Sequence, residues 1–219
     1  MQIQVNKAST VSGATPTETD MQHINRLTLR ELTTEDVYTF RCVACNDLVD
    51  RDFERFPAET LAKLAPMFVG RTVILDHCWT AKGQTARIYR SEVVRQEDGH
   101  HDLLVACYML RNDSTADAIA AIEGGILKET SVGCAVSRAV CSICGEDYGT
   151  CGHQKGATYN GKLCTVDLLD PVDAYEMSFV AVPAQPGAGV IKSHEKTGWT
   201  TAELSAAKAR LAIERERWN

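Results

Sequence analysis

Short stretches in which hydrophobic residues alternate with polar ones, or in which β-branched residues cluster, recur along the chain from about Ile24. Such stretches are typical of β-strands, because successive side chains of a strand point to opposite faces of a sheet. The sequence therefore predicts a mainly β protein. The predicted strands cover residues 25–32, 37–45, 72–75, 85–95, 102–110, 129–139, 165–169 and 174–182.

Helical patterns interrupt these strands at three places. Residues 57–68 have an acidic first turn, and residues 114–123 are followed by Gly124 and Gly125, which are typical of a helix end. Residues 200–218 form the longest pattern, with Ser or Thr positioned to cap a helix. We expect the first two helices to pack on the periphery of the sheet, which makes the fold class α+β, and the third to form a C-terminal helix.

The chain divides into three regions by composition. The first 24 residues are rich in Ser, Thr, Gly and Gln and lack periodicity, which predicts a flexible N-terminal arm. Residues 25–192 are expected to form one domain, because 219 residues with 44% hydrophobic residues are enough for a single sizeable core. Residues 193–219 are expected to be a linker and the C-terminal helix.

Charge and hydropathy exclude some partners. The net charge of −6 argues against nucleic acid as the main partner. No window approaches eighteen consecutive apolar residues and the first thirty residues lack a signal-peptide core, so we expect a cytoplasmic protein without a membrane partner. Nine cysteines, an odd count without a secretion signal, favour thiols or metal ligands over a disulfide framework.

The most specific local signal is the segment CSICGEDYGTCGH, which places Cys141, Cys144, Cys151 and His153 within thirteen positions. A CxxC turn directs two thiolates at one ion, and the CxH that follows supplies two more ligands for a tetrahedral Zn²⁺. Four protein ligands would fill the coordination shell, so the predicted zinc site is structural. The alternatives are free thiols or a redox-active CxxC.

Three further cysteines bear on this prediction. Cys164 follows the loop closely enough to replace one of the four ligands. Cys42 and Cys45 form a second CxxC, but they lie in a predicted strand, where thiols commonly serve as small buried hydrophobic groups.

Candidate residues for acyl transfer stand at the edges of two predicted strands. His77 ends the run TVILDH, and Ser131 lies in ETSVG. A serine hydroxyl is a poor nucleophile at neutral pH unless a nearby imidazole takes its proton, and these two residues could fill those roles. Ser178 is a weaker candidate, because Gly133 near Ser131 allows backbone N–H groups to approach a substrate carbonyl.

The order of several segments resembles the prohead maturation proteases of tailed phages, which are similar in fold to the herpesvirus capsid assembly proteases. The resemblance covers about residues 35–192. It implies a closed or partly closed antiparallel β-barrel of the herpesvirus-protease type, with residues 141–164 as a small zinc-binding insertion. The segments are DRDFERFP (50–57), FVGRTVILDH (68–77), LKETSVGC (127–134), the CSICG…CGHQKG loop from residue 141, and YEMSFVAVPAQPGA (175–188).

The resemblance also implies the roles of the site residues. Ser131 is the expected nucleophile and His77 its base, and Glu176 is the expected acid that orients the imidazole. Asp76 and Asp173 are rival acids. Cys78 and Cys134 lie beside or near the His and the Ser, so a cysteine nucleophile is the alternative.

The implied function is a serine endopeptidase that cuts scaffold and capsid proteins, and also itself, while a phage prohead matures. Its expected partners are the major capsid protein and the scaffold protein as substrates, and further copies of itself in a homo-oligomer such as a dimer. Its expected location is the assembling prohead in the host cytoplasm. Two other classes stay open: a noncatalytic zinc-stabilised scaffold or assembly protein, and a zinc hydrolase that uses His77, Asp76 and the cysteine cluster.

Overall fold

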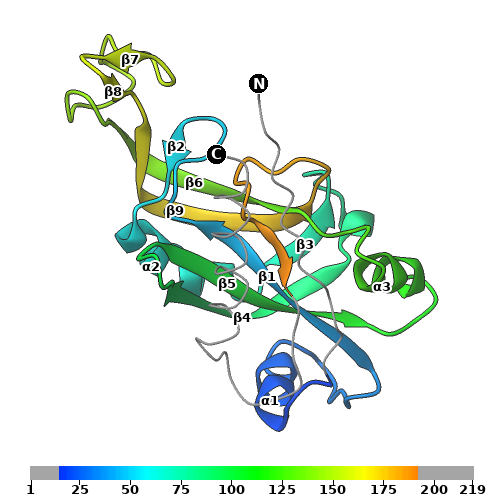
Figure 1. Cartoon of the computed structure of the whole chain (residues 1–219). Helices are drawn as coiled ribbons and strands as arrows, with labels where there is room; N and C mark the ends of the chain where they lie inside the picture. Colours follow the sequence, from blue (N-terminus) through cyan, green and yellow to red (C-terminus); the bar gives the residue numbers. More distant parts are fainter. Residues whose placement is uncertain (1–14, 192–219) are drawn as a thin grey trace.

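The computed structural model describes residues 15–191, which form a sheet-rich body with three α-helices (Figure 1). The fold is therefore α+β and mainly β, as the sequence predicted. The predicted C-terminal helix, its linker and the first fourteen residues of the predicted arm lie outside the described residues.

One large sheet carries most of the strands. It runs in the order β10-β1-β5-β4-β3-β9-β2, and β6 pairs with β9 beside that path, while β7 and β8 form a small separate pair. The strands are β1 (Val37–Asn46), β2 (Glu54–Arg55), β3 (Thr72–Leu75), β4 (Ala86–Arg95), β5 (His101–Leu110), β6 (Thr130–Cys141), β7 (Thr158–Tyr159), β8 (Lys162–Leu163), β9 (Val166–Phe179) and β10 (Gly189–Ile191).

The sheet does not close into a barrel. β10 pairs with β1 and reaches the start of β6 only through an isolated bridge between Glu129 and Gly189. The predicted closed or partly closed barrel of the herpesvirus-protease type is therefore not confirmed. The sheet is also mixed rather than antiparallel, because β2 and β3 both run parallel to β9.

Two of the helices match the sequence prediction. Helix α2 (Ala58–Phe68) buries Leu61, Leu64 and Phe68 against the sheet, and helix α3 (Ala116–Glu123) buries Ile119 and Ile122. Both have the apolar spacing that places one face of a helix in a core.

Helix α1 (Glu18–Asn25) overturns two predictions, because residues 18–24 are not a flexible arm and residues 25–32 are not a strand. A capping box begins the helix: the Asp20 N–H donates to the Thr17 hydroxyl, and the Thr17 N–H donates to the Asp20 carboxylate, both at 3.1 Å. Buried Ile24 then joins a small second core with Tyr89 and Tyr108. Local capping and this packing outweigh the polar composition.

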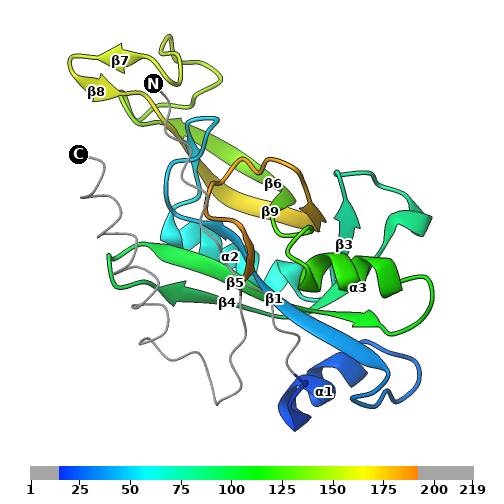
Figure 2. The same ribbon diagram turned by 45° about the vertical axis from the view of Figure 1, so that its right-hand side comes forward.

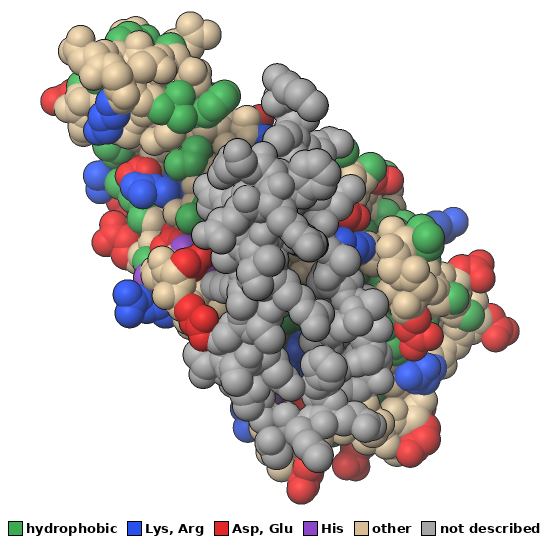
Figure 3. Space-filling view, in the orientation of Figure 1, with side chains coloured by type: hydrophobic (Ala, Val, Ile, Leu, Met, Phe, Trp, Pro, Cys, Tyr) green, Lys and Arg blue, Asp and Glu red, His purple; other side chains and the backbone are tan. Residues whose placement is uncertain are grey.

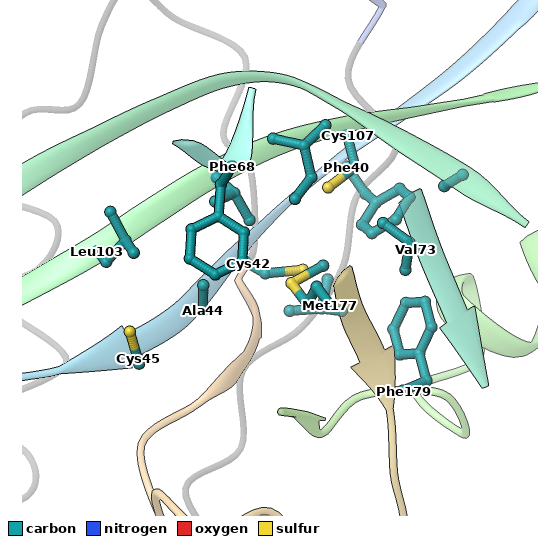
Figure 4. Close-up of a cluster of buried hydrophobic side chains, with 14 of the residues drawn as sticks. Phe40, Cys42, Ala44, Cys45, Phe68, Val73, Leu103, Cys107, Met177 and Phe179 are labelled. Carbon is teal, nitrogen blue, oxygen red and sulfur yellow. The ribbon is translucent and has the colours of Figure 1, made fainter. Parts of the chain in front are cut away.

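The main core lies between α2 and the sheet, and Figure 4 shows part of it. Phe40, Phe68 and Phe179 supply its large side chains. Cys42 and Cys45 lie on β1 among them, and burial raises the pKa of both thiols. These two cysteines are small buried groups of the core, as predicted.

The two predicted strands at 165–169 and 174–182 are one long strand, β9, which pairs with β6 along nearly its whole length. Asp170 and Pro171 resemble a turn in sequence, and Asp170 does have a left-handed φ of 51°. However, the Asp170 carboxylate accepts from Lys63 Nζ at 2.8 Å and from Arg138 at 2.9 Å. The chain therefore continues through an irregularity in the β6–β9 pairing instead of turning.

Candidate active site and metal lobe

The end of β3 directs His77 toward β9. Asp76 and His77 both have left-handed backbones, with φ of 51° and 52°. A tight turn follows, in which the Cys78 N–H donates to the Leu75 carbonyl at 2.9 Å, while the Asp76 N–H donates to the Phe179 carbonyl at 3.0 Å. Residues with a side chain adopt this conformation at an energetic cost, and such strain is common at functional sites.

The imidazole of His77 is bound to a buried carboxylate. Its Nδ1 lies 2.7 Å from Glu176 Oε1, and the His77 side chain is 41% exposed whereas that of Glu176 is 3% exposed. An ionised carboxylate can only accept, so Nδ1 is the donor, and in the neutral imidazole Nε2 keeps its lone pair. Of the rival acids, Asp173 is paired with Arg71 at 2.6 Å. The structure therefore brings Glu176 to His77 in the way that an orienting acid requires.

Ser178 completes the hydrogen bonding of this pair. Its hydroxyl donates to Glu176 Oε2 at 2.6 Å and accepts from the His77 N–H at 3.0 Å. The side chain is fully buried, which places it out of reach of a peptide substrate.

Gly133 leaves the space that Glu176 occupies. The two residues are opposite each other in the β6–β9 pairing, and a Cβ on Gly133 would overlap Glu176 Oε1. Only glycine fits at this position of β6 while the carboxylate keeps its bond to His77.

Ser131 lies on the same face of the sheet as these groups. It pairs with Ser178 across the strands, two residues from Gly133, whereas Val132 between them packs against the core. No hydrogen bond joins Ser131 to His77 in the described part of the chain, and in substrate-free sites this contact is often long. Register thus brings the predicted nucleophile, base and acid to one region without joining all three.

A cavity of about 260 Å³ lies along the first half of β6 and reaches Ser131 and Gly133. The other walls come from β1, the chain around β2, β9 and the segment before β10. Asp50, Phe56 and Gln185 are among the residues that line it. Burial raises the pKa of Asp50, although the N–H groups of Asp52 and Glu54 donate to its carboxylate.

The cysteine rivals are placed differently from Ser131. Cys134 packs against the core, and burial, followed by the negative charge of Glu176, raises its pKa to about 11. A thiol with so high a pKa is a poor nucleophile at neutral pH. Cys78 is exposed in the turn after His77.

Residues 141–165, which we call the metal lobe, connect β6 to β9 and project from the end of that strand pair (Figures 1 and 2). The ligand atoms of Cys141, Cys144, Cys151 and His153 lie within 4.8 Å of one another. These four side chains, the set predicted from the sequence, could hold a metal ion.

The CxxC turn suits a thiolate. The Ile143 N–H donates to Cys141 Sγ at 3.4 Å, and the Gly145 N–H donates to the Cys141 carbonyl at 2.8 Å. Burial acts to raise the pKa of Cys141, but hydrogen bonds from the backbone of Cys144 and Ile143 outweigh it and lower that pKa to about 6. Deprotonated sulfur is the form that binds metal.

A further cysteine borders this cluster, and one of its members has a buried polar atom without a partner. Cys164 is fully buried, and its Sγ lies 3.8 Å from Cys141 Sγ. Two thiolates on one tetrahedral Zn²⁺ are separated by about the same distance, roughly 3.8 Å for Zn–S bonds near 2.3 Å. His153 Nδ1 is buried and lacks a hydrogen-bond partner. Cys164 therefore remains a candidate to replace one of the four ligands.

The metal lobe is anchored to the body at β2. Lys155 Nζ lies 2.6 Å from Glu54 Oε1, the Val166 N–H donates to the Phe53 carbonyl at 2.9 Å, and the Phe53 ring covers Gly156, whose φ is 84°. Away from its contacts with β2, the part of the metal lobe that is visible in Figure 3 carries mostly uncharged side chains.

The metal lobe and the candidate active site lie at opposite ends of the β6–β9 pair. Cys141 pairs with Val166 at one end, and Ser131 pairs with Ser178 near the other. Ten residues of strand separate Cys141 from Ser131, which corresponds to about 33 Å. This separation does not support a single metal site that includes both His77 and the cysteines.

Comparison with known proteins finds no match: no family model, no curated protein and no solved structure is significantly similar to the chain. None of the described helices has both the length and the apolar character needed to cross a bilayer.

Sequence reasoning treated Ser178 only as a rival nucleophile and missed its bonds to His77 and Glu176. The alternation E-x-S in YEMSFV does place both side chains on one face, but nothing in the sequence shows that the His77 turn meets them. The cavity was missed as well, since two of the residues that line it, Asp50 and Gln185, lie 135 positions apart in the sequence.

Proposed function

We propose that the protein is a serine endopeptidase with Ser131 as nucleophile, His77 as general base and Glu176 as the acid that orients His77. The observation that carries the proposal is the 2.7 Å bond between His77 Nδ1 and the buried Glu176 carboxylate, on the face of the sheet that bears Ser131. This bond leaves Nε2 available to take a proton.

In the proposed reaction, Ser131 Oγ attacks the carbonyl carbon of the scissile peptide bond while its proton passes to His77 Nε2. His77 returns that proton to the leaving nitrogen, the C–N bond breaks, and an ester joins Ser131 to the acyl half. Water then attacks the ester with His77 again as base, which releases the acid and restores the Ser131 hydroxyl. Backbone N–H groups beside Gly133 would stabilise the oxyanion.

The surroundings of Ser131 suit an extended peptide. Among the described strands β6 pairs with β9 alone, and isolated bridges to other segments are found only at its two ends, at Glu129 and Val140. The middle of its other edge is therefore unpaired next to the cavity. An open strand edge can accept a peptide as an added strand, and a neighbouring cavity can receive one of its side chains. Cleavage of scaffold and capsid proteins within a phage prohead, and the relation to a herpesvirus-type barrel, rest on the motif resemblance.

We further propose that the metal lobe holds a structural Zn²⁺ on Cys141, Cys144, Cys151 and His153. The residues fit this ion because they offer thiolate and imidazole donors within one small volume. When bound, the ion would cross-link the lobe, and it takes no part in the peptide-bond chemistry.

Labelling with a serine-directed fluorophosphonate tests the proposed nucleophile. Intact mass should show one adduct on the wild-type protein and on Ser137→Ala, which removes an exposed hydroxyl of the same strand. Ser131→Ala should remain unlabelled while keeping the wild-type melting temperature. An adduct that persists in Ser131→Ala would exclude Ser131 as nucleophile.

The noncatalytic scaffold makes the opposite prediction. It requires that no folded variant reacts, including wild-type protein in assembled particles, and that particles mature normally when Ser131 and His77 are both replaced.

A further inference from the structure

We propose that Ser178 is a positioning residue for the candidate active site: its hydroxyl holds the His77 turn and the Glu176 carboxylate in the arrangement that binds Nδ1 and leaves Nε2 free. The inference rests on the proposed function, which gives Ser178 no role.

Both hydrogen-bonding capacities of the hydroxyl are used within the site. The Ser178 proton goes to Glu176 Oε2 at 2.6 Å, and its oxygen accepts the His77 N–H at 3.0 Å. The hydroxyl is fully buried, so a peptide substrate cannot reach it as the attacking group. Its two hydrogen bonds instead link His77 and Glu176, which must stay aligned with each other.

The bond to His77 supports a strained backbone. Asp76 and His77 are both left-handed, and this conformation persists only where surrounding contacts hold it. The Asp76 and Cys78 N–H groups bind backbone carbonyls, but the His77 N–H binds the side chain of Ser178. The N–H of the central residue of this turn, His77, is therefore held by a side chain, whereas the N–H groups of Asp76 and Cys78 are held by backbone.

The bond to Glu176 fixes the direction of the carboxylate. Oε1 binds His77 and Oε2 binds Ser178, so both oxygens of this buried group have a donor. Without the hydroxyl, Oε2 would be buried without a partner, which a carboxylate avoids by rotating or by taking up a proton. Either change weakens the bond to His77 Nδ1.

The test compares Ser178→Ala and Ser178→Cys with Ser178→Thr. Alanine removes the hydroxyl, cysteine replaces it with a weak donor of similar shape, and threonine retains it. The rate of fluorophosphonate adduct formation at saturation should fall about 10- to 100-fold in the Ala and Cys variants, a usual size for groups one step removed from a site. The half-saturating concentration should not change, and Thr should restore the rate.

A second measurement does not depend on activity. The proton between His77 Nδ1 and Glu176 should give a far-downfield NMR resonance in wild-type protein and in Ser178→Thr, and it should be lost in the Ala and Cys variants. The matched control is Ser91→Ala, since Ser91 Oγ is buried without a hydrogen-bond partner, and it should change neither readout.

The outcomes separate this inference from the proposed function. Labelling of Ser131 at the wild-type rate in folded Ser178→Ala and Ser178→Cys, with the resonance retained, overturns the role of Ser178 alone. Labelling that does not depend on Ser131 overturns the proposed function, and the resonance then still decides whether Ser178 positions His77. If the Ala variant does not fold, the Cys variant decides.

Discussion

Gly133 shapes the candidate site through the side chain that it lacks. We expect Gly133→Ala to push Glu176 Oε1 away from His77, because the added methyl group would overlap that oxygen. The expected cost is about 1 to 3 kcal/mol of unfolding free energy, as for other overpacked buried positions. The free energy of unfolding, measured in denaturant, and the rate of fluorophosphonate labelling should both fall.

The control for this change is Gly152→Ala in the metal lobe. A Cβ there meets no atom within 4 Å, and its φ is not left-handed, so neither readout should change. A Gly133→Ala protein that keeps the wild-type rate would show that Glu176 has room to move without consequence.

At this scale the residue pattern could name the candidates but could not pair them, and only the motif resemblance selected Glu176. His77 and Glu176 stand 99 positions apart, and three carboxylates were available to the imidazole from sequence alone. The parallel register of β3 on β9 brings Glu176 to His77, and the ion pair with Arg71 occupies Asp173. Side-chain competition of this kind leaves no trace in hydrophobic periodicity.

Among the elements, α1 illustrates how much one cap contributes. We expect Thr17→Ala to lower the unfolding free energy by about 1 kcal/mol, because it removes the hydroxyl that accepts the Asp20 N–H. Thr17→Ser keeps that acceptor and should behave like wild type in urea unfolding. Equal stability of the Ala and Ser variants would mean that the capping box contributes nothing.

The same cap should make stability depend on pH. Burial acts to raise the pKa of Asp20, but hydrogen bonds from Thr17 and Tyr89 outweigh it and hold that pKa below the usual 3.8. The ionised carboxylate therefore stabilises the fold above pH 3.8, and this contribution disappears as the pH falls through the lower, folded-state value. Wild type should exceed Asp20→Asn in stability at neutral pH, with a difference that shrinks below about pH 3.8.

The metal lobe should melt without its ion while the candidate active site survives. Chelation, or Cys144→Ser, should remove bound metal and expose the lobe to protease, because no other described core supports the loop. Elemental analysis and limited proteolysis measure this, with Cys78→Ser as the control outside the cluster. Fluorophosphonate labelling should persist, and its loss on chelation would show that the ion also supports the candidate active site.

Elements with strong local periodicity were predicted well, and elements set by tertiary contacts were not. The patterns at 57–68 and 114–123 correspond to α2 and α3, but the run at 25–32 forms no strand because the capped helix before it uses Ile24 for packing. The sequence predicts two strands where β9 is continuous, because the ion pairs of Asp170 with Lys63 and Arg138 join segments that are far apart in the sequence.

For the whole molecule, the fold class was predictable from the sequence, but whether the sheet closes into a barrel was not. A mainly β chain with peripheral helices follows from strand and helix patterns, whereas the order of strands depends on pairings between distant segments. β10 is three residues long, which is too short to join β1 and β6 along their lengths. The composition of this segment does not indicate so short a strand. The described molecule is therefore an open mixed sheet.

The central place of β9 also sets when the site can exist during synthesis. β2, β3 and β6 all pair with this strand, and it supplies the acceptor for the His77 N–H as well as the acid for its ring. A ribosome makes the segment with His77 about a hundred residues before Glu176, so a nascent chain carries an unformed turn until β9 emerges. The hydrogen bonds among His77, Glu176 and Ser178 can therefore form only when translation of the described domain is almost complete.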